Sequence, residues 1–169
     1  MKKACYIFVV ASGLLMFSSC NINKNITPPP TQLEIRQMQT RDYDTKDTRL
    51  VMKSLLNVLQ DEGFIIKNAT LDLGMISAEK SIDIENSSEA FFAKINGGNY
   101  AHWRTHMLVE ISGNVSEYGD QTRIRINIQK KVYDNYGAVV DVDQIKDGEY
   151  YQKLFIKIDK GIFIQSEDL

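Results

Sequence analysis

The fold is decided by residues 107–132, MLVEISGNVSEYGDQTRIRINIQKKV. Apolar and polar residues alternate in both halves of this stretch, which is typical of strands that bury one face. A turn near Tyr118, Gly119 and Asp120 separates the two halves. We therefore predict a long antiparallel hairpin whose buried side chains are Met107, Val109, Ile111, Val115, Ile124, Ile126, Ile128 and Val132.

A helix and a second hairpin are predicted before this stretch. Apolar residues recur at helical spacing over residues 46–62, and Asp44, Thr45 and Asp47 offer capping oxygens at the start. Gly63 suits the left-handed position that follows a helix. Residues 64–71 and 75–84 are rich in β-branched and apolar side chains and flank the turn Asp72-Leu73-Gly74, which predicts a hairpin.

The two ends of the domain complete the predicted order. A weak alternation from Leu33 to Thr40 indicates a first strand near a sheet edge. After an irregular stretch over residues 134–146, Asp147 precedes an apolar stripe typical of a second helix, made of Tyr151, Leu154, Phe155, Ile158 and Ile162. We predict an α+β fold of order β-α-β-β-β-β-α, an antiparallel sheet of about five strands with two helices packed on one face.

Residues 1–19 have the organisation of an export signal. Two lysines precede an apolar run, Tyr6–Phe17, which is too short to span a bilayer. Phe17-Ser18-Ser19-Cys20 resembles the lipobox of bacterial lipoproteins, although that family usually has an aliphatic residue where Phe17 stands. The resemblance implies that Cys20 receives a lipid and becomes the mature N-terminus. The alternatives are a plain signal peptide with a chance cysteine and an N-terminal anchor helix.

Residues 20–31 are expected to form a lipidated tether, because three consecutive prolines at 28–30 favour an extended spacer. Residues 32–169 then form a single domain. Asn21, by resemblance to the sorting rule of enteric-type lipoproteins, favours the outer membrane. We expect a lipid-anchored protein of the bacterial envelope on the periplasmic face of that membrane.

Charge and cysteine content exclude several classes of protein. Lys2 and Lys3 leave with the signal, so 18 of the 20 basic residues remain against 22 acidic ones, a net charge of −4 that does not attract nucleic acid. The two cysteines are Cys5, inside the signal, and Cys20. The mature chain therefore has no partner thiol for an intramolecular disulfide.

Two further segments resemble a known family. Gln39-Thr40-Arg41-Asp42-Tyr43-Asp44-Thr45, with Val58-Leu59-Gln60-Asp61-Glu62-Gly63-Phe64 after the helix, is similar to small proteobacterial outer-membrane lipoproteins of unsettled activity, as is Tyr150-Tyr151-Gln152-Lys153-Leu154-Phe155. The order of elements also resembles the helix-grip domains of BamC, a lipoprotein of the β-barrel assembly machinery. Such a likeness implies an architecture and not a function.

We find no catalytic constellation, no cofactor motif and no metal spacing. His102 and His106 are four residues apart, but they lie where a loop enters a strand and no third ligand accompanies them. No Gly-x-Ser-x-Gly motif positions a nucleophile. Arg123, Arg125, Lys130 and Lys131 form a basic stripe that would suit phosphate headgroups or an acidic partner, and the alternative is a solvated sheet face.

The segment 85–105 interrupts two strands and is rich in aromatic residues. If exposed, Phe91, Phe92, Tyr100 and Trp103 would anchor a protein partner, since large rings bury much area at little entropic cost. The alternative is that both phenylalanines lie under the sheet edge and Trp103 fills the core. We expect a noncatalytic interaction module, a subunit of an outer-membrane or secretion assembly. The alternative is a carrier of a small apolar ligand between sheet and C-terminal helix, lined by Phe155 and Ile158.

The lipid anchor gives the first testable prediction. Cys20→Ser should release the protein from envelope membranes and abolish palmitate labelling, because the acyl chains supply the membrane affinity at about 0.8 kcal/mol per buried methylene. Membrane fractionation and labelling of cells measure both effects. A substituted chain that still sediments with membranes, together with a native chain that never takes up label, would contradict the lipoprotein assignment.

Overall fold

The computed structural model describes residues 28–97 and 100–167. The expected signal peptide, Cys20 and most of the tether lie outside these residues. The described part is an α+β fold with six strands in one antiparallel sheet and four helices. The predicted class is therefore confirmed, whereas the expected five strands and two helices were too few.

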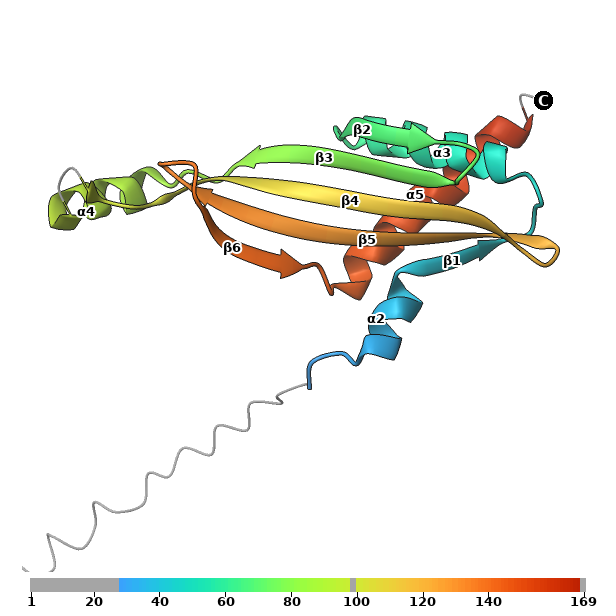
Figure 1. Ribbon diagram of the computed structural model, residues 1–169, viewed down its shortest axis with the longest axis horizontal. Coiled ribbons are helices and arrows are strands. Elements are labelled where there is room, and N and C mark those ends of the chain that lie inside the picture. Colours follow the sequence, from blue (N-terminus) through green and yellow to red (C-terminus); the bar gives the residue numbers. More distant parts are fainter. Residues whose placement is uncertain (1–27, 98–99, 168–169) are drawn as a thin grey trace, which may run out of the picture.

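Three of the strands arise from the apolar alternations of the sequence. Strand β3 (Met75–Asp83) pairs with β4 (Arg104–Tyr118), which pairs along its length with β5 (Gln121–Asp134). Strand β2 (Ile65–Thr70) forms one edge beside β3. At the opposite edge, β5 is flanked by two short strands, β1 (Thr40–Tyr43) and β6 (Val139–Gln144). Figure 1 shows these strands as one long curved sheet.

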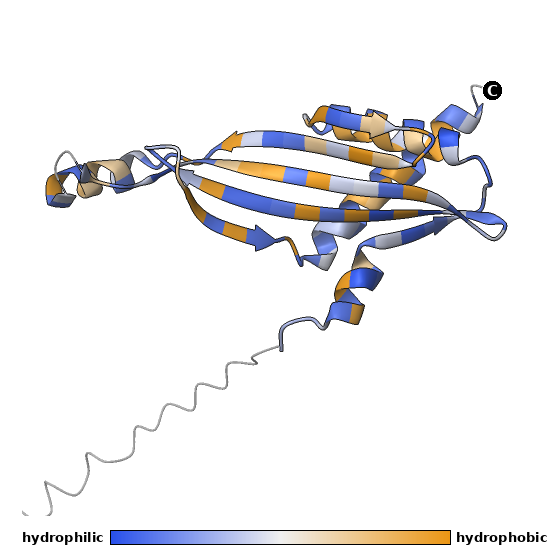
Figure 2. Ribbon diagram, in the orientation of Figure 1, coloured by the Kyte–Doolittle hydropathy of each residue, from blue (hydrophilic) through white to orange (hydrophobic). Residues whose placement is uncertain are grey.

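Two helices cover one face of the sheet, α3 (Thr48–Asp61) and α5 (Gly148–Glu167) (Figure 1). Between helices and sheet lies the core, which contains the inward residues of β4 and β5 together with Leu55, Leu59, Phe155 and Ile158. The other face of the sheet carries the polar residues of the alternation, so burial is one-sided, as the sequence predicts. Figure 2 shows the two kinds of residue alternating along the strands.

The ends of α3 agree with the predicted capping. The Asp47 side chain accepts a hydrogen bond from the backbone amide of Leu50 at 2.8 Å. Gly63 has the expected positive φ, +80°. This turn brings Phe64 back onto the helix, where it is buried and donates its amide to the Leu59 carbonyl at 2.9 Å. Gly74 is equally constrained between β2 and β3, since a Cβ there would lie 1.8 Å from the Val115 carbonyl oxygen.

The predicted first strand over residues 33–40 is wrong. Residues Gln32–Met38 form helix α2, and β1 starts only at Thr40. Thr31 and Glu34 form a reciprocal capping box, which fixes the first helical turn. Ile35 is the buried residue of this helix, and Leu33, which the alternation placed on the same face, is 67% exposed.

Two segments expected to be irregular contain regular structure. The stretch 134–146 contains β6, which follows a tight turn and pairs with the end of β5. The insert 85–105 contains helix α4 (Ser87–Gly97). Both elements are short and largely exposed, so they lack the apolar periodicity that reveals a buried element.

The outer edge of β5 has a gap between β1 and β6, and a buried polar cluster fills it. The Gln39 carbonyl accepts from the Ile126 amide at 2.8 Å. Two positions further along, the Tyr151 hydroxyl accepts from the Ile128 amide at 3.2 Å and from the Gln39 side chain at 3.4 Å. Helix α5 thus contributes to the hydrogen bonding along the outer edge of β5, and burial raises the pKa of the Tyr151 phenol.

Tyr151→Phe should lower the free energy of unfolding by about 1–3 kcal/mol, because it leaves the buried Ile128 amide without an acceptor. Its matched control is Tyr150→Phe, one residue earlier on the exposed side of α5, where we expect a change within about 0.5 kcal/mol. Urea denaturation of both variants measures the difference. If the two variants have equal free energies of unfolding, the Tyr151 hydroxyl does not stabilise the edge of β5.

Candidate functional site

Helix α4 lies beyond the end of the sheet, on the connection between β3 and β4 (Figure 1). Asn86 precedes the helix, and its side chain accepts from the Ser88 amide at 3.0 Å. Small residues face the body of the protein: Ala90 is buried, as is Ala101 after the helix. The insert that the sequence singled out therefore contains a helix that projects beyond the sheet.

The apolar side chains of α4 point to solvent. Phe91, Phe92 and Ile95 are 60%, 62% and 62% exposed, and Tyr100 is 87% exposed. Positions 91, 92 and 95 fall within one side of a helix, and the two phenylalanine rings meet edge to face with centroids 5.8 Å apart. The alternative in which Phe91 and Phe92 lie under the sheet edge is wrong. We call Phe91, Phe92, Ile95 and Tyr100 the aromatic tip.

Charged and aromatic contacts hold α4 against the sheet. Glu89 forms a two-point ion pair with Arg104 at the start of β4, with separations of 3.1 and 3.3 Å. Lys94 lies over the Trp103 ring, 4.8 Å from its centroid, and the Trp103 indole donates to Glu85 at 3.1 Å. Trp103 is half-buried in these contacts, so it positions the aromatic tip instead of filling the core.

The two histidines have separate partners. The His102 Nδ1 atom lies 2.8 Å from a carboxylate oxygen of Asp134 at the end of β5. The His106 ring stacks on Tyr133, with centroids 4.6 Å apart. Within the described ranges no group of three or more His, Cys, Asp or Glu side chains is arranged to hold a metal ion.

Asp134 organises the base of the projection. Its buried carboxylate accepts from the backbone amides of Tyr136 and Ala138 at 3.0 and 2.8 Å, besides facing His102. His102 first, and then these amides, hold the pKa of Asp134 below its usual value. A hollow of about 400 Å³ opens beside it and is lined by Glu89, His102, Trp103, Arg104, Val132, Asp134, Val140 and Asp141. No sequence motif indicates the pairing of His102 with Asp134, because 32 residues separate the two side chains.

The basic stripe on β5 is largely neutralised. Arg123 forms two hydrogen bonds with Asp42 at 2.6 and 2.8 Å and lies over the Tyr118 ring. The pair with Asp42 raises the pKa of Arg123 and lowers the pKa of Asp42. Lys131 binds Glu110 at 2.9 Å. These cations have partners within the chain, which favours the solvated-face alternative over a site for phosphate.

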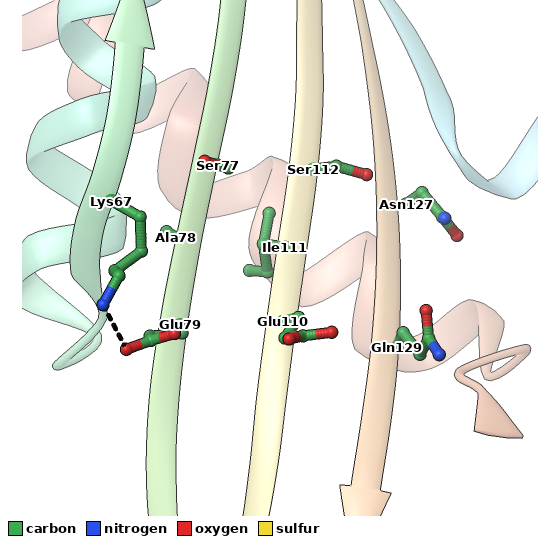
Figure 3. Close-up of a pocket in the computed structure, with 9 residues that line it drawn as sticks. All are labelled: Lys67, Ser77, Ala78, Glu79, Glu110, Ile111, Ser112, Asn127 and Gln129. Carbon is green, nitrogen blue, oxygen red and sulfur yellow. Dashed lines mark hydrogen bonds and ion pairs between the residues drawn. The ribbon is translucent and has the colours of Figure 1, made fainter. Parts of the chain in front are cut away.

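A second hollow, of about 270 Å³, lies on the sheet face that α3 and α5 leave open. Figure 3 shows its side chains projecting from the strands on the side away from the helices. Seven of the nine lining residues are polar, and the full lining consists of Lys67, Ser77, Ala78, Glu79, Glu110, Ile111, Ser112, Asn127 and Gln129. The sequence did not reveal this hollow, because it depends on the register of four strands.

No protein-family model matches the chain, and no curated protein matches its sequence. The likeness to small outer-membrane lipoproteins therefore depends on the segments quoted above. Among the described helices, none combines the length and the apolar character needed to cross a membrane.

The Asp134 contacts predict a pH dependence. A carboxyl whose folded pKa is lowered stabilises the fold above its unfolded pKa of about 3.9, and this stabilisation is lost as the pH falls through the folded value. Asp134→Asn should therefore lower the free energy of unfolding at pH 7. At pH 3 the unfolding free energies of the variant and the native chain should differ less. Urea denaturation at both pH values measures the difference. If the difference in unfolding free energy between the two chains is the same at both pH values, the charge of Asp134 does not have this role.

Proposed function

We propose that the chain is a noncatalytic lipoprotein of the bacterial envelope, tethered to the outer membrane through Cys20, which binds a protein partner through the aromatic tip. The anchor is inferred from Phe17-Ser18-Ser19-Cys20 and the apolar run before it. The partner is inferred to be a subunit of an outer-membrane or secretion assembly in which this chain is an accessory module.

The exposure of the aromatic tip is the observation that carries the proposal. Burying a phenylalanine or isoleucine side chain that is now exposed contributes about 1.5–3 kcal/mol. Three such side chains together with Tyr100 on one projection can supply most of the energy of a specific contact, because few residues dominate an interface. Helix α4 is held in position by contacts of Glu89, Arg104 and Trp103. This reduces the conformational entropy that is lost on binding.

The charges around α4 favour a protein over a lipid surface as its partner. Helices that bind anionic membranes carry unpaired lysines and arginines on their polar side. Here Lys94 lies on the Trp103 ring and Arg104 is paired with Glu89, while Asp83 and Glu85 stand at the start of the projection. This arrangement therefore offers few unpaired positive charges to a membrane with negative headgroups.

The apolar-ligand alternative gains no support from the packing. Phe155 and Ile158 are buried in the continuous core between α5 and the sheet. Neither side chain lines the hollow beside Asp134 or the hollow on the open face.

The aromatic tip can be tested in intact cells with a photoreactive amino acid in place of Ile95. We expect a discrete protein adduct that falls at least tenfold in the Phe91→Ser/Phe92→Ser background, since tenfold corresponds to about 1.4 kcal/mol of lost contact. The unfolding free energy should change by less than about 0.5 kcal/mol, because both rings are exposed.

Phe163 provides the matched control, because it is 64% exposed on α5, outside the aromatic tip. The photoreactive residue placed there should give no such adduct, and Phe163→Ser should leave the adduct at position 95 unchanged. Adducts of equal strength at both positions would indicate nonspecific contact. If position 95 forms adducts with lipid alone, the aromatic tip binds the membrane and not a protein.

A further inference from the structure

Polar side chains form a band across the open face of the sheet, at right angles to the strands. One row follows the register Asn68–Ser77–Ser112–Asn127 from β2 to β5. The next row follows Glu79–Glu110–Gln129–Gln144 from β3 to β6. Five neighbouring strands at about 4.8 Å spacing give the band a length of about 19 Å. The hollow of about 270 Å³ lies along it (Figure 3).

The charges within the band are already paired. Lys67 binds Glu79 at 2.8 Å, the contact drawn in Figure 3, and Lys131 binds Glu110 at 2.9 Å. A site for an ionic ligand would present a charge free to pair with it. Because each carboxylate of the hollow has its own lysine, the band favours an uncharged ligand.

The remaining groups have unused hydrogen-bonding capacity. Within the described residues, the side chains of Ser77, Ser112 and Gln129 have no hydrogen-bond partner. The Asn127 carbonyl oxygen accepts from the Gln39 and Gln144 amides at 3.3 and 2.6 Å, which fixes the side chain and leaves its NH₂ group as a donor. Hydroxyl and amide groups both donate and accept, as the hydroxyl groups of a sugar do.

The composition of the band is unlike the centre of a protein interface. Such centres are enriched in aromatic residues, methionine and arginine and depleted in serine, lysine and glutamate. The hollow contains two serines, two glutamates and a lysine, with no aromatic side chain. A peptide strand would also need a free sheet edge for its main-chain hydrogen bonds, and the band lies on a face.

We infer that the band is a binding site for an uncharged, polyhydroxylated ligand, an oligosaccharide that lies across strands β2 to β6. Its hydroxyl groups exchange hydrogen bonds with Ser77, Ser112, Asn127 and Gln129, and the lysine–glutamate pairs border it. This inference is independent of the aromatic tip, since the two surfaces share no residue.

The test uses the full chain in detergent, labelled with nitrogen-15 and titrated with three uncharged tetrasaccharides: a β-1,4-linked N-acetylglucosamine tetramer, cellotetraose and maltotetraose. We expect at least one to give saturable amide shifts centred on residues 110–113 and 127–129. Ser112→Leu fills the hollow and should weaken that binding at least tenfold. Ser116→Leu, on the same face of β4 but outside the band, should change it less than twofold.

Gln129→Ala is a second variant that removes a hydrogen-bonding group without adding bulk, and it should weaken binding several-fold. The inference is overturned if none of the tetrasaccharides saturates up to about 10 mM. It is also overturned if Ser112→Leu and Ser116→Leu weaken binding equally. Tighter, salt-sensitive binding of a polyanionic oligosaccharide or a peptide at the same residues would assign the band to another ligand class.

Discussion

The β4–β5 hairpin buries one face only, and this determines how the other elements pack around it. Its inward isoleucines and valines require an apolar cover, which α3 and α5 provide through Leu55, Leu59, Phe155 and Ile158. Because side chains alternate strictly along a strand, the same register sends serine, asparagine, glutamine and glutamate to the opposite face. The polar band is therefore a direct consequence of how the core is formed, and it remains accessible because α3 and α5 lie on the other side of the sheet.

The same constraint explains how much of the fold the sequence predicts. The hairpins, α3 and α5 are long enough for their apolar periodicity to be unambiguous, and Gly63 marks the end of α3 by a specific backbone requirement. Helix α2 was mistaken for a strand because seven residues with one buried side chain carry too little periodicity, although the Thr31–Glu34 capping box was present. Strand β6 and helix α4 are exposed, so packing leaves little pattern in their sequences.

The residues of the candidate sites also differ in how far the sequence predicts them. Phe91, Phe92 and Tyr100 could be chosen from sequence because aromatic residues in an insert are unusual, and their exposure supports the choice. Trp103 was expected to bind a partner beside them, but it is half-buried, and its role in holding α4 follows from Lys94 and Glu85, which only the fold brings to its ring and indole. Asp134 beside His102 and the rows of the polar band depend on strand register. Register is a property of pairs of strands, which periodicity within one strand does not specify.

Hydrogen exchange in the native envelope distinguishes a lipid-anchored domain that presents the aromatic tip to a protein from one whose aromatic tip stays exposed to solvent. Exchange measured by mass spectrometry would compare the protein in isolated outer membranes with the purified chain in detergent. We expect the peptide covering residues 87–97 to exchange more slowly in the membranes, whereas peptides from α5 should exchange equally in both preparations. Equal exchange of residues 87–97 in the two preparations would contradict it.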